Sequence, residues 1–143
     1  MYSFNIERPT SVADAVSALG DDEAQALGGG QTLIPTLKAR LASPTTLVSL
    51  TGIADMSGIS ASGGNVTIGG ATNHATVAAD NSYPALSALA ANIGDPAVRN
   101  RGTIGGSIAN NDPSACYPAA ALASGATITT NTREIAADDY FLG

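Results

Sequence analysis

The chain of 143 residues has no tryptophan, a single cysteine and a single histidine, and only 13% of its residues are charged. One cysteine cannot form a disulfide within the chain, and no Cys and His residues stand at the spacing of a zinc or iron–sulfur site, so we expect no metal site here. No apolar run approaches the length of a membrane span, and the N-terminus lacks the pattern of a secretory signal. These absences predict a cytoplasmic protein without membrane insertion.

Positive charge is also scarce, because 6 basic residues stand against 12 acidic ones and the net charge is −6. Nucleic acids and anionic membranes attract basic surfaces, so the composition argues against a nucleic-acid partner. Aromatic residues make up only 4% of the chain whereas 44% of it is hydrophobic, so the core must consist mainly of aliphatic side chains. The length suits one domain or two small lobes.

Glycine, by contrast, is abundant and clustered in two runs, residues 28–35 (GGGQTLIP) and 99–107 (RNRGTIGGS). Glycine lacks a Cβ and tolerates positive φ, so such a run can turn its backbone N–H groups toward a bulky anion. Four of the 6 basic residues lie in or beside the runs: Lys38, Arg40, Arg99 and Arg101. The two runs therefore predict two walls of one phosphate site, and a dinucleotide pyrophosphate is the expected ligand.

A simpler interpretation is that the runs are tight turns between packed elements, which is the better interpretation of a single run. Two runs of similar chemistry favour binding. Neither run is a GxGxxG fingerprint with an acidic residue about twenty positions later, and neither is a GxxxxGK[ST] loop, so Rossmann and P-loop sites are excluded.

The periodicity of apolar residues predicts an α+β fold of two lobes. Residues 1–53 are expected to form a small βαβαβ lobe, in which Ser11 and Asp14 cap the first helix and Leu33, Leu37 and Leu41 share one face of the second. The expected order is a strand at 3–8, a helix at 12–19, a strand at 25–27, a helix from 33 and a strand at 46–50.

Residues 54–143 are expected to form a larger, mixed lobe. Its predicted elements are a hairpin turned at residues 62–65 (SGGN), helices at 72–79, 84–93 and 118–124, and a second hairpin that joins 126–130 to 133–136.

Residues 27–53 (LGGGQTLIPTLKARLASPTTLVSLTGI) and 93–128 (IGDPAVRNRGTIGGSIANNDPSACYPAAALASGATI) resemble the two FAD-binding signatures of the medium, flavoprotein subunit of molybdenum hydroxylases. This is the family of carbon monoxide dehydrogenase and xanthine dehydrogenase. The resemblance also includes an opening F-x-x-x-R-P and the closing REIAADDYFLG. It implies the two-lobe FAD-binding fold of the PCMH type, with FAD between the lobes.

The resemblance also implies an oxidoreductase function. This chain would be the FAD-binding electron-transfer subunit, which passes electrons from iron–sulfur clusters on a partner chain to an external acceptor. The implied partners are a small subunit with 2Fe-2S clusters and a large subunit with molybdopterin. Family members continue beyond the equivalent of Gly143, so the resemblance predicts a chain truncated at its C-terminus.

The resemblance assigns the pyrophosphate to both runs and leaves this chain without a catalytic residue of its own. The family usually has an acidic residue where this chain has Cys116, so one polar contact of the cofactor differs here. The implied cofactor-binding residues are Gly28, Gly29, Gly30, Gln31, Thr32, Thr103, Ile104, Gly105, Gly106 and Ser107, with Asn110 and Asp112 lining the same site.

The remaining candidate residues favour structural roles. His74, without a carboxylate nearby in sequence, is expected at the surface near a helix start, and Thr72 suits an N-cap as well as a place near the flavin. Cys116 is expected to be a small buried residue, and Asp138 and Asp139 to lie in a solvated turn.

Two other functions compete with the electron-transfer subunit. One is a non-catalytic FAD- or nucleotide-binding scaffold module, or a truncated remnant of the subunit. The other is a self-sufficient FAD oxidase of the wider family, which would require a substrate lobe that this length does not accommodate.

Overall fold

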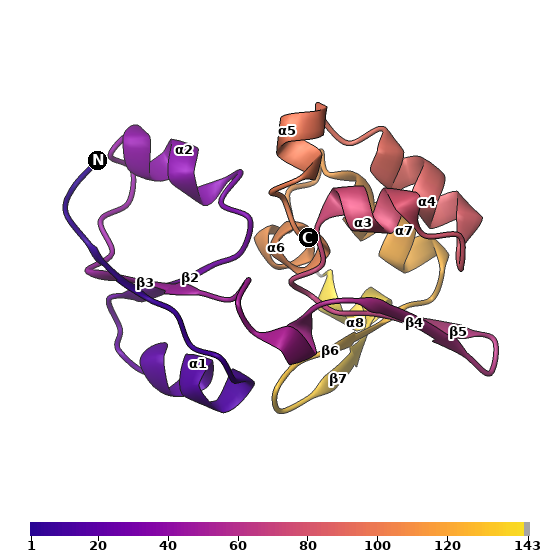
Figure 1. Ribbon diagram of the computed structural model, residues 1–143, viewed down its shortest axis with the longest axis horizontal. Coiled ribbons are helices and arrows are strands. Elements are labelled where there is room, and N and C mark those ends of the chain that lie inside the picture. Colours follow the sequence, from indigo (N-terminus) through magenta and orange to yellow (C-terminus); the bar gives the residue numbers. More distant parts are fainter. Residues whose placement is uncertain (142–143) are drawn as a thin grey trace.

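The computed structural model describes residues 1–141, and the elements fall into two groups that lie side by side (Figure 1). Leu142 and Gly143, the last residues assigned to the second lobe, lie outside the described residues. The helices of the described part have at most eight residues, and none of them has the length and apolarity needed to cross a bilayer.

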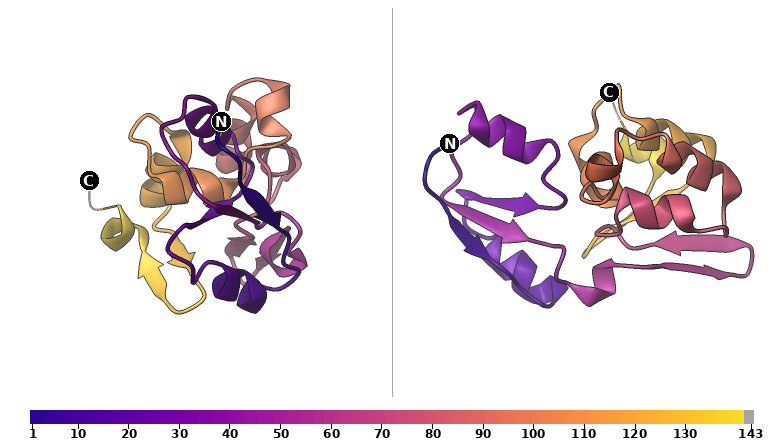
Figure 2. Two further views of the ribbon diagram at one scale, coloured as in Figure 1. Left: turned by 90° about the vertical axis from the view of Figure 1, so that its left-hand side faces the viewer. Right: turned by 45° about the horizontal axis from the view of Figure 1, so that its top comes forward.

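The first group is a three-stranded parallel sheet with a helix on each face (Figures 1 and 2). The strand order is β1-β3-β2, and Ile6 and Gln25 both pair with Leu47 of the central strand. Its elements in chain order are β1 (Asn5–Glu7), α1 (Val12–Ala18), β2 (Ala24–Leu27), α2 (Leu33–Lys38) and β3 (Thr46–Ser49). The predicted βαβαβ order is therefore confirmed.

The burial of the central strand follows from this layering. Leu47 and Val48 point to opposite faces of β3, and both have an exposed fraction of 0% because a helix covers each face. Val48 packs with Ala15 of α1 and with Ile53 in one hydrophobic cluster.

Local signals fix the ends of the two helices. Ser11 caps α1 as predicted, since its Oγ accepts a hydrogen bond of 3.1 Å from the backbone N–H of Asp14 and donates one of 2.7 Å to the Asp14 carboxylate. The helix after the first run is shorter than predicted. It ends at Lys38, the chain turns at Arg40 with φ 58°, and Leu41 is 79% exposed instead of continuing the buried face.

The second group combines two antiparallel hairpins with short helices. The hairpins pair β4 (Ile59–Ser62) with β5 (Asn65–Ile68) and β6 (Thr127–Thr129) with β7 (Glu134–Ala136), as predicted. The helices are α3 (His74–Ala79), α4 (Pro84–Ala91), α5 (Pro96–Arg99), α6 (Ile104–Asn110), α7 (Cys116–Ala123) and α8 (Ala137–Tyr140), preceded by a 3₁₀ turn at Ala54–Met56.

Sequence analysis missed α5, α6 and α8. The clearest reason is visible in α6, whose sequence IGGSIAN contains two glycines and has low intrinsic helix propensity. Tertiary packing compensates for that low propensity, because Ile104 and Ile108 join the hydrophobic cluster of Val77, Ala90 and Tyr117.

Candidate cofactor-binding site at the junction of the glycine runs

The first glycine run connects β2 to α2 and leaves a series of backbone donors free. Within residues 1–141, the backbone N–H groups of residues 28–32 donate no hydrogen bond. Gly30 turns the chain with φ 75° and its carbonyl accepts from the N–H of Ile34, while the Gln31 amide folds back 3.2 Å to the Gly29 carbonyl. Since these residues are half-buried or exposed, their N–H groups are available to an anion.

The second run is held by the preceding segment, residues 70–74. The N–H of Ile104 donates to the Thr72 carbonyl and the N–H of Gly105 to the Gly70 carbonyl, at 3.0 and 2.9 Å. The approach is close, because a Cβ on Gly105 would lie 2.7 Å from Gly70 Cα. The N–H groups of Gly106 and Ser107 bond to Thr103, so the N–H of Thr103 is the one backbone donor of residues 103–107 without a partner in residues 1–141.

The two runs touch each other at their glycines. A Cβ on Gly29 would overlap the Arg101 carbonyl and lie 2.6 Å from Gly102 Cα, and a Cβ on Gly28 would lie 2.9 Å from Thr103 Oγ1. The runs therefore do not face each other across a gap at Gly28 and Gly29, as two separate walls would. They form one continuous rim, and glycine is needed there for backbone contact between the lobes.

The other predicted contacts are more scattered. Gln31 and Thr32 are exposed beside the rim, and Ser107 is half-buried on the first turn of α6. Asn110 lies at the far end of α6, about 10 Å along the axis from Thr103. Within the described chain, neither the Asn110 nor the Asp112 side chain bonds to either run, and the Asp112 carboxylate accepts from the N–H of Ser114.

Two of the four basic residues near the runs have other partners. Arg40 lies over the ring of Tyr2 at 5.4 Å, and Arg99 donates to the carbonyls of residues 93 and 94 at 3.2 and 2.9 Å. Lys38 and Arg101 are exposed. Arg40 and Arg99 keep their positive charge, because these partners are neutral, but the Arg99 guanidinium is already engaged in hydrogen bonds.

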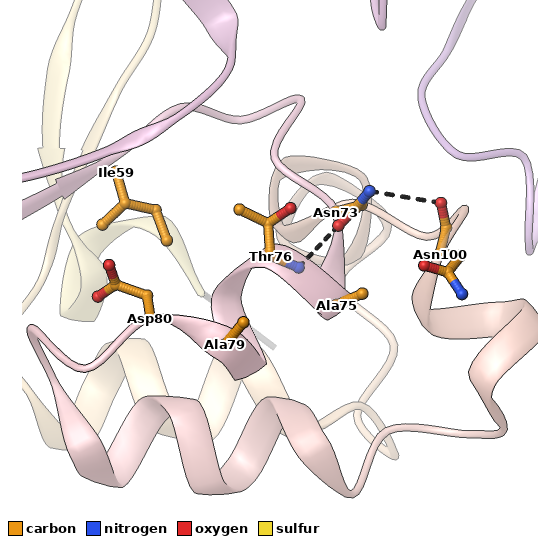
Figure 3. Close-up of a pocket in the computed structure, with 7 residues that line it drawn as sticks. All are labelled: Ile59, Asn73, Ala75, Thr76, Ala79, Asp80 and Asn100. Atoms are coloured by element: carbon orange, nitrogen blue, oxygen red, sulfur yellow. Dashed lines mark hydrogen bonds between the residues drawn. The ribbon is translucent and has the colours of Figure 1, made fainter.

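Behind the rim, Asn73 ties the start of α3 to the second run (Figure 3). Its side-chain carbonyl caps α3 by accepting from the N–H of Thr76 at 2.8 Å, and its amide donates to the Asn100 carbonyl at 3.4 Å. A shallow hollow of about 540 Å³ opens on this side, and none of the predicted cofactor contacts lines it.

His74 and Thr72 differ from the sequence predictions. His74 begins α3 but is only 5% exposed, because its ring lies beneath Gly102 and beside Tyr117. Thr72 is not the helix cap. Its hydroxyl accepts from the N–H of Gly58 at 2.9 Å and donates to the Gly58 carbonyl at 3.1 Å, which fixes the chain before β4. The N-cap of α3 is Asn73, and an asparagine directly before a helix is the sequence signal that could have identified it.

His74 and Tyr117 form a buried polar pair that is poorly satisfied. Their ring centroids lie 5.3 Å apart with a tilt of 43°, and neither His74 Nδ1 nor the Tyr117 hydroxyl has a hydrogen-bond partner within residues 1–141. Burial lowers the pKa of His74, which keeps the imidazole neutral near pH 7, and raises the pKa of Tyr117. An unpaired buried polar group costs about 1–3 kcal/mol, so this pair does not stabilise the core through hydrogen bonds.

Cys116 and the two aspartates are also placed differently. Cys116 is exposed at the start of α7, because Tyr117, Pro118 and Ala121 occupy the buried face of that helix. Asp138 and Asp139 are exposed to solvent as predicted, but they lie in the first turn of α8 rather than in a loop turn. Among residues 1–141, no group of His, Cys, Asp and Glu side chains is suited to hold a metal ion.

A family model described as the FAD binding domain in molybdopterin dehydrogenase matches residues 2–143. The chain belongs to this family of FAD-binding domains. The match confirms the predicted family, the α+β FAD-binding fold and FAD as the cofactor of the domain.

Relatives of this FAD-binding domain occur in several oxidoreductases. The chain is 42% identical to the carbon monoxide dehydrogenase medium chain of Afipia carboxidovorans, with 99% of this chain and 52% of the relative covered. It is 34% identical to the glyceraldehyde dehydrogenase medium chain of Sulfolobus acidocaldarius, with 98% and 53% covered.

Solved structures agree closely with the fold. Carbon monoxide dehydrogenase from Hydrogenophaga pseudoflava superposes with a TM-score of 0.93 at 37% identity, over 98% of this chain and 52% of that chain. Quinoline 2-oxidoreductase from Pseudomonas putida 86 gives 0.94 at 33% identity, over 99% and 53%. The chain thus spans about half the length of the relatives it matches.

Proposed function

We propose that this chain is the FAD-binding part of the medium subunit of a molybdenum hydroxylase, with its lobes at residues 1–53 and 54–143. The FAD pyrophosphate lies on the rim formed by residues 28–32 and Thr103. The observation that carries the proposal is the series of unpaired backbone N–H groups in the first run. Successive backbone N–H groups without a partner in the protein form an anion-binding concavity, and a diphosphate offers matching acceptors.

The donor set fits a diphosphate in number and in charge. Residues 28–32 and Thr103 offer backbone N–H groups, Gln31 and Thr32 add an exposed amide and hydroxyl, and no acidic residue lies in either run. A hydrogen bond to a charged acceptor contributes about 1.5–3 kcal/mol, so a few such bonds suffice for tight binding.

In this proposal, most of the other predicted cofactor-binding residues hold the rim in place and do not contact the pyrophosphate. Ile104 and Gly105 use their N–H groups to hold the second run against residues 70–72, and Gly106 satisfies the Thr103 hydroxyl. Ser107 is a further possible ligand of the phosphates from the side of α6. Asn110 and Asp112 lie farther along and belong to the outer part of the proposed site.

Bound FAD supplies the redox chemistry, and this chain binds and orients it. Electrons reach the flavin from iron–sulfur clusters on a small partner subunit and leave for an external acceptor, while a large partner subunit holds molybdopterin and the oxidised substrate. These partners, and a cytoplasmic location, are part of the proposal.

The test is a competition titration together with the absorption spectrum of the purified protein. We expect flavin bands in the spectrum, and we expect ADP to compete with FAD better than FMN does, because ADP carries the diphosphate and FMN does not. Gln31→Ala should weaken FAD binding a few-fold, whereas Gln25→Ala, an exposed glutamine on β2 away from the rim, should not.

Binding of FMN as tight as that of FAD, with no competition by ADP, would mean that the ring and not the pyrophosphate anchors the cofactor. Bound flavin that no partner or dithionite reduces would indicate the non-catalytic scaffold instead.

A further inference from the structure

The imidazole of His74 lies in a narrow space behind the cofactor rim. On one side it meets Gly102, where a Cβ would overlap His74 Nε2 and lie 2.8 Å from His74 Cδ2. It also meets the ring of Tyr117 on α7, with the two ring centroids 5.3 Å apart and the rings tilted by 43°. The imidazole therefore contacts both the second glycine run and α7.

The backbone of the same residue is bonded to the run. The N–H of His74 donates to the Gly102 carbonyl at 3.0 Å, and its neighbour Asn73 forms an isolated antiparallel bridge with Thr103. A displacement at residue 74 is thus transmitted directly to Gly102 and Thr103. These two residues are the part of the second run that contacts Gly28 and Gly29 of the first.

Stability alone does not explain a histidine at this place. Its Nδ1 has no partner within residues 1–141, and the hydroxyl of the neighbouring Tyr117 has none either. An apolar side chain of similar size would remove the unpaired Nδ1 from the lobe. What the imidazole does provide is a thin, rigid plate that fits under a glycine.

We propose that His74 is a positioning residue for the cofactor rim: its ring, wedged between Gly102 and Tyr117, sets the position at which the second glycine run presents Thr103 to the first run and to the FAD pyrophosphate. The part of this inference that concerns FAD rests on the proposed function. The part that concerns the position of the run stands on the contacts of residues 74 and 102.

The test uses four variants of the protein as it is purified: His74→Ala, Gly102→Ala, the double variant, and Val77→Ala as control. Val77 is buried one turn further along α3 in the core cluster, and none of the three atoms nearest to a Cβ on Gly102 belongs to it. We expect His74→Ala and Val77→Ala both to lower the melting temperature, but only His74→Ala to weaken FAD binding by about tenfold, the equivalent of one charge-assisted hydrogen bond.

The double variant tests the wedge directly. Gly102→Ala alone forces a collision with the His74 ring, whereas His74→Ala removes that collision and leaves the Val98 carbonyl oxygen, 3.3 Å from the new methyl group, as the next neighbour. The double variant should therefore be more stable than Gly102→Ala and bind FAD more tightly than it does. Hydrogen exchange gives a second readout, since His74→Ala should speed exchange of the Ile104 and Gly105 amides more than Val77→Ala does, although Val77 packs in the same cluster as Ile104.

The possible outcomes separate the two proposals. If the wild-type protein binds no FAD, the proposed function fails, and the stability and exchange measurements still decide the role of His74. The inference is wrong if the effects of His74→Ala and Gly102→Ala on stability and FAD binding simply add. It is also wrong if Val77→Ala weakens FAD binding and speeds amide exchange as much as His74→Ala does, because His74 is then an ordinary core residue.

Discussion

The contact between the two glycine runs leads to a quantitative prediction for Gly29→Ala. The new Cβ would lie 2.5 Å from the Arg101 carbonyl carbon and 2.6 Å from Gly102 Cα, whereas non-bonded carbon atoms prefer about 3.5–4.0 Å. The runs must therefore separate by about 1 Å. Because the obstacle is backbone and not a flexible side chain, we expect a loss of about 1–3 kcal/mol in the free energy of unfolding.

Separation of the runs should also affect FAD. The donors of residues 28–32 and of Thr103 would then no longer sit at a common distance from one diphosphate. Loss of one hydrogen bond to a charged phosphate oxygen corresponds to about a tenfold increase in the dissociation constant. This is the result we expect for Gly29→Ala.

The assay combines denaturant unfolding with titration of FAD, followed by quenching of its fluorescence. Gly52→Ala is the matched control, because a Cβ there meets only the Pro9 carbonyl at an ordinary 3.8 Å and the backbone has no positive φ. If Gly29→Ala behaves like Gly52→Ala in both measurements, the two glycine runs are not in contact in solution and do not form one continuous rim.

Three further predictions concern the second lobe. Tyr117→Phe should raise the free energy of unfolding by about 1 kcal/mol, because it removes a buried hydroxyl without a partner. A loss of stability in denaturant unfolding would show instead that the hydroxyl is hydrogen-bonded. Burial lowers the pKa of His74 below 6.5, so the unfolded chain takes up a proton at a higher pH than the folded chain does. The free energy of unfolding should therefore fall as the pH drops below about 6.5. His74→Phe should flatten that part of the pH profile, and an unchanged profile would contradict the burial of a neutral His74. Thr72→Val should lower the free energy of unfolding by about 1–3 kcal/mol, because both hydrogen bonds to Gly58 are lost. The control Thr76→Val changes an exposed side chain of α3 and should alter the free energy of unfolding little. Equal effects of the two variants would argue against the Thr72 contact.

Sequence reasoning was sound wherever the signal is local. The cap of α1 depends on Ser11 and Asp14, which are three residues apart, and the first hairpin depends on the turn SGGN between its own strands. The parallel order of the first lobe follows from alternating strand and helix patterns. Each of these features depends on residues within a few positions of one another, so the sequence alone determines them.

The two glycine runs show where that reasoning ends. Their composition predicted a place for phosphate, and the family resemblance led to FAD, but the sequence suggested two separate walls. Contact between Gly29 and Gly102 joins residues 73 positions apart, and it depends on how two lobes pack. No local pattern carries that information.

The same limit explains the errors at α6 and at His74. Helix propensity argues against α6, and only its packing on the cluster of Val77 and Tyr117 keeps it helical. His74 looked like a surface residue because its surroundings are supplied by Gly102 and Tyr117, which come later in the chain. The sequence by itself determined the elements that have local signals, the family and the two glycine runs, since these depend on local chemistry. Burial and contact between distant segments were decided only when the chain packed in three dimensions.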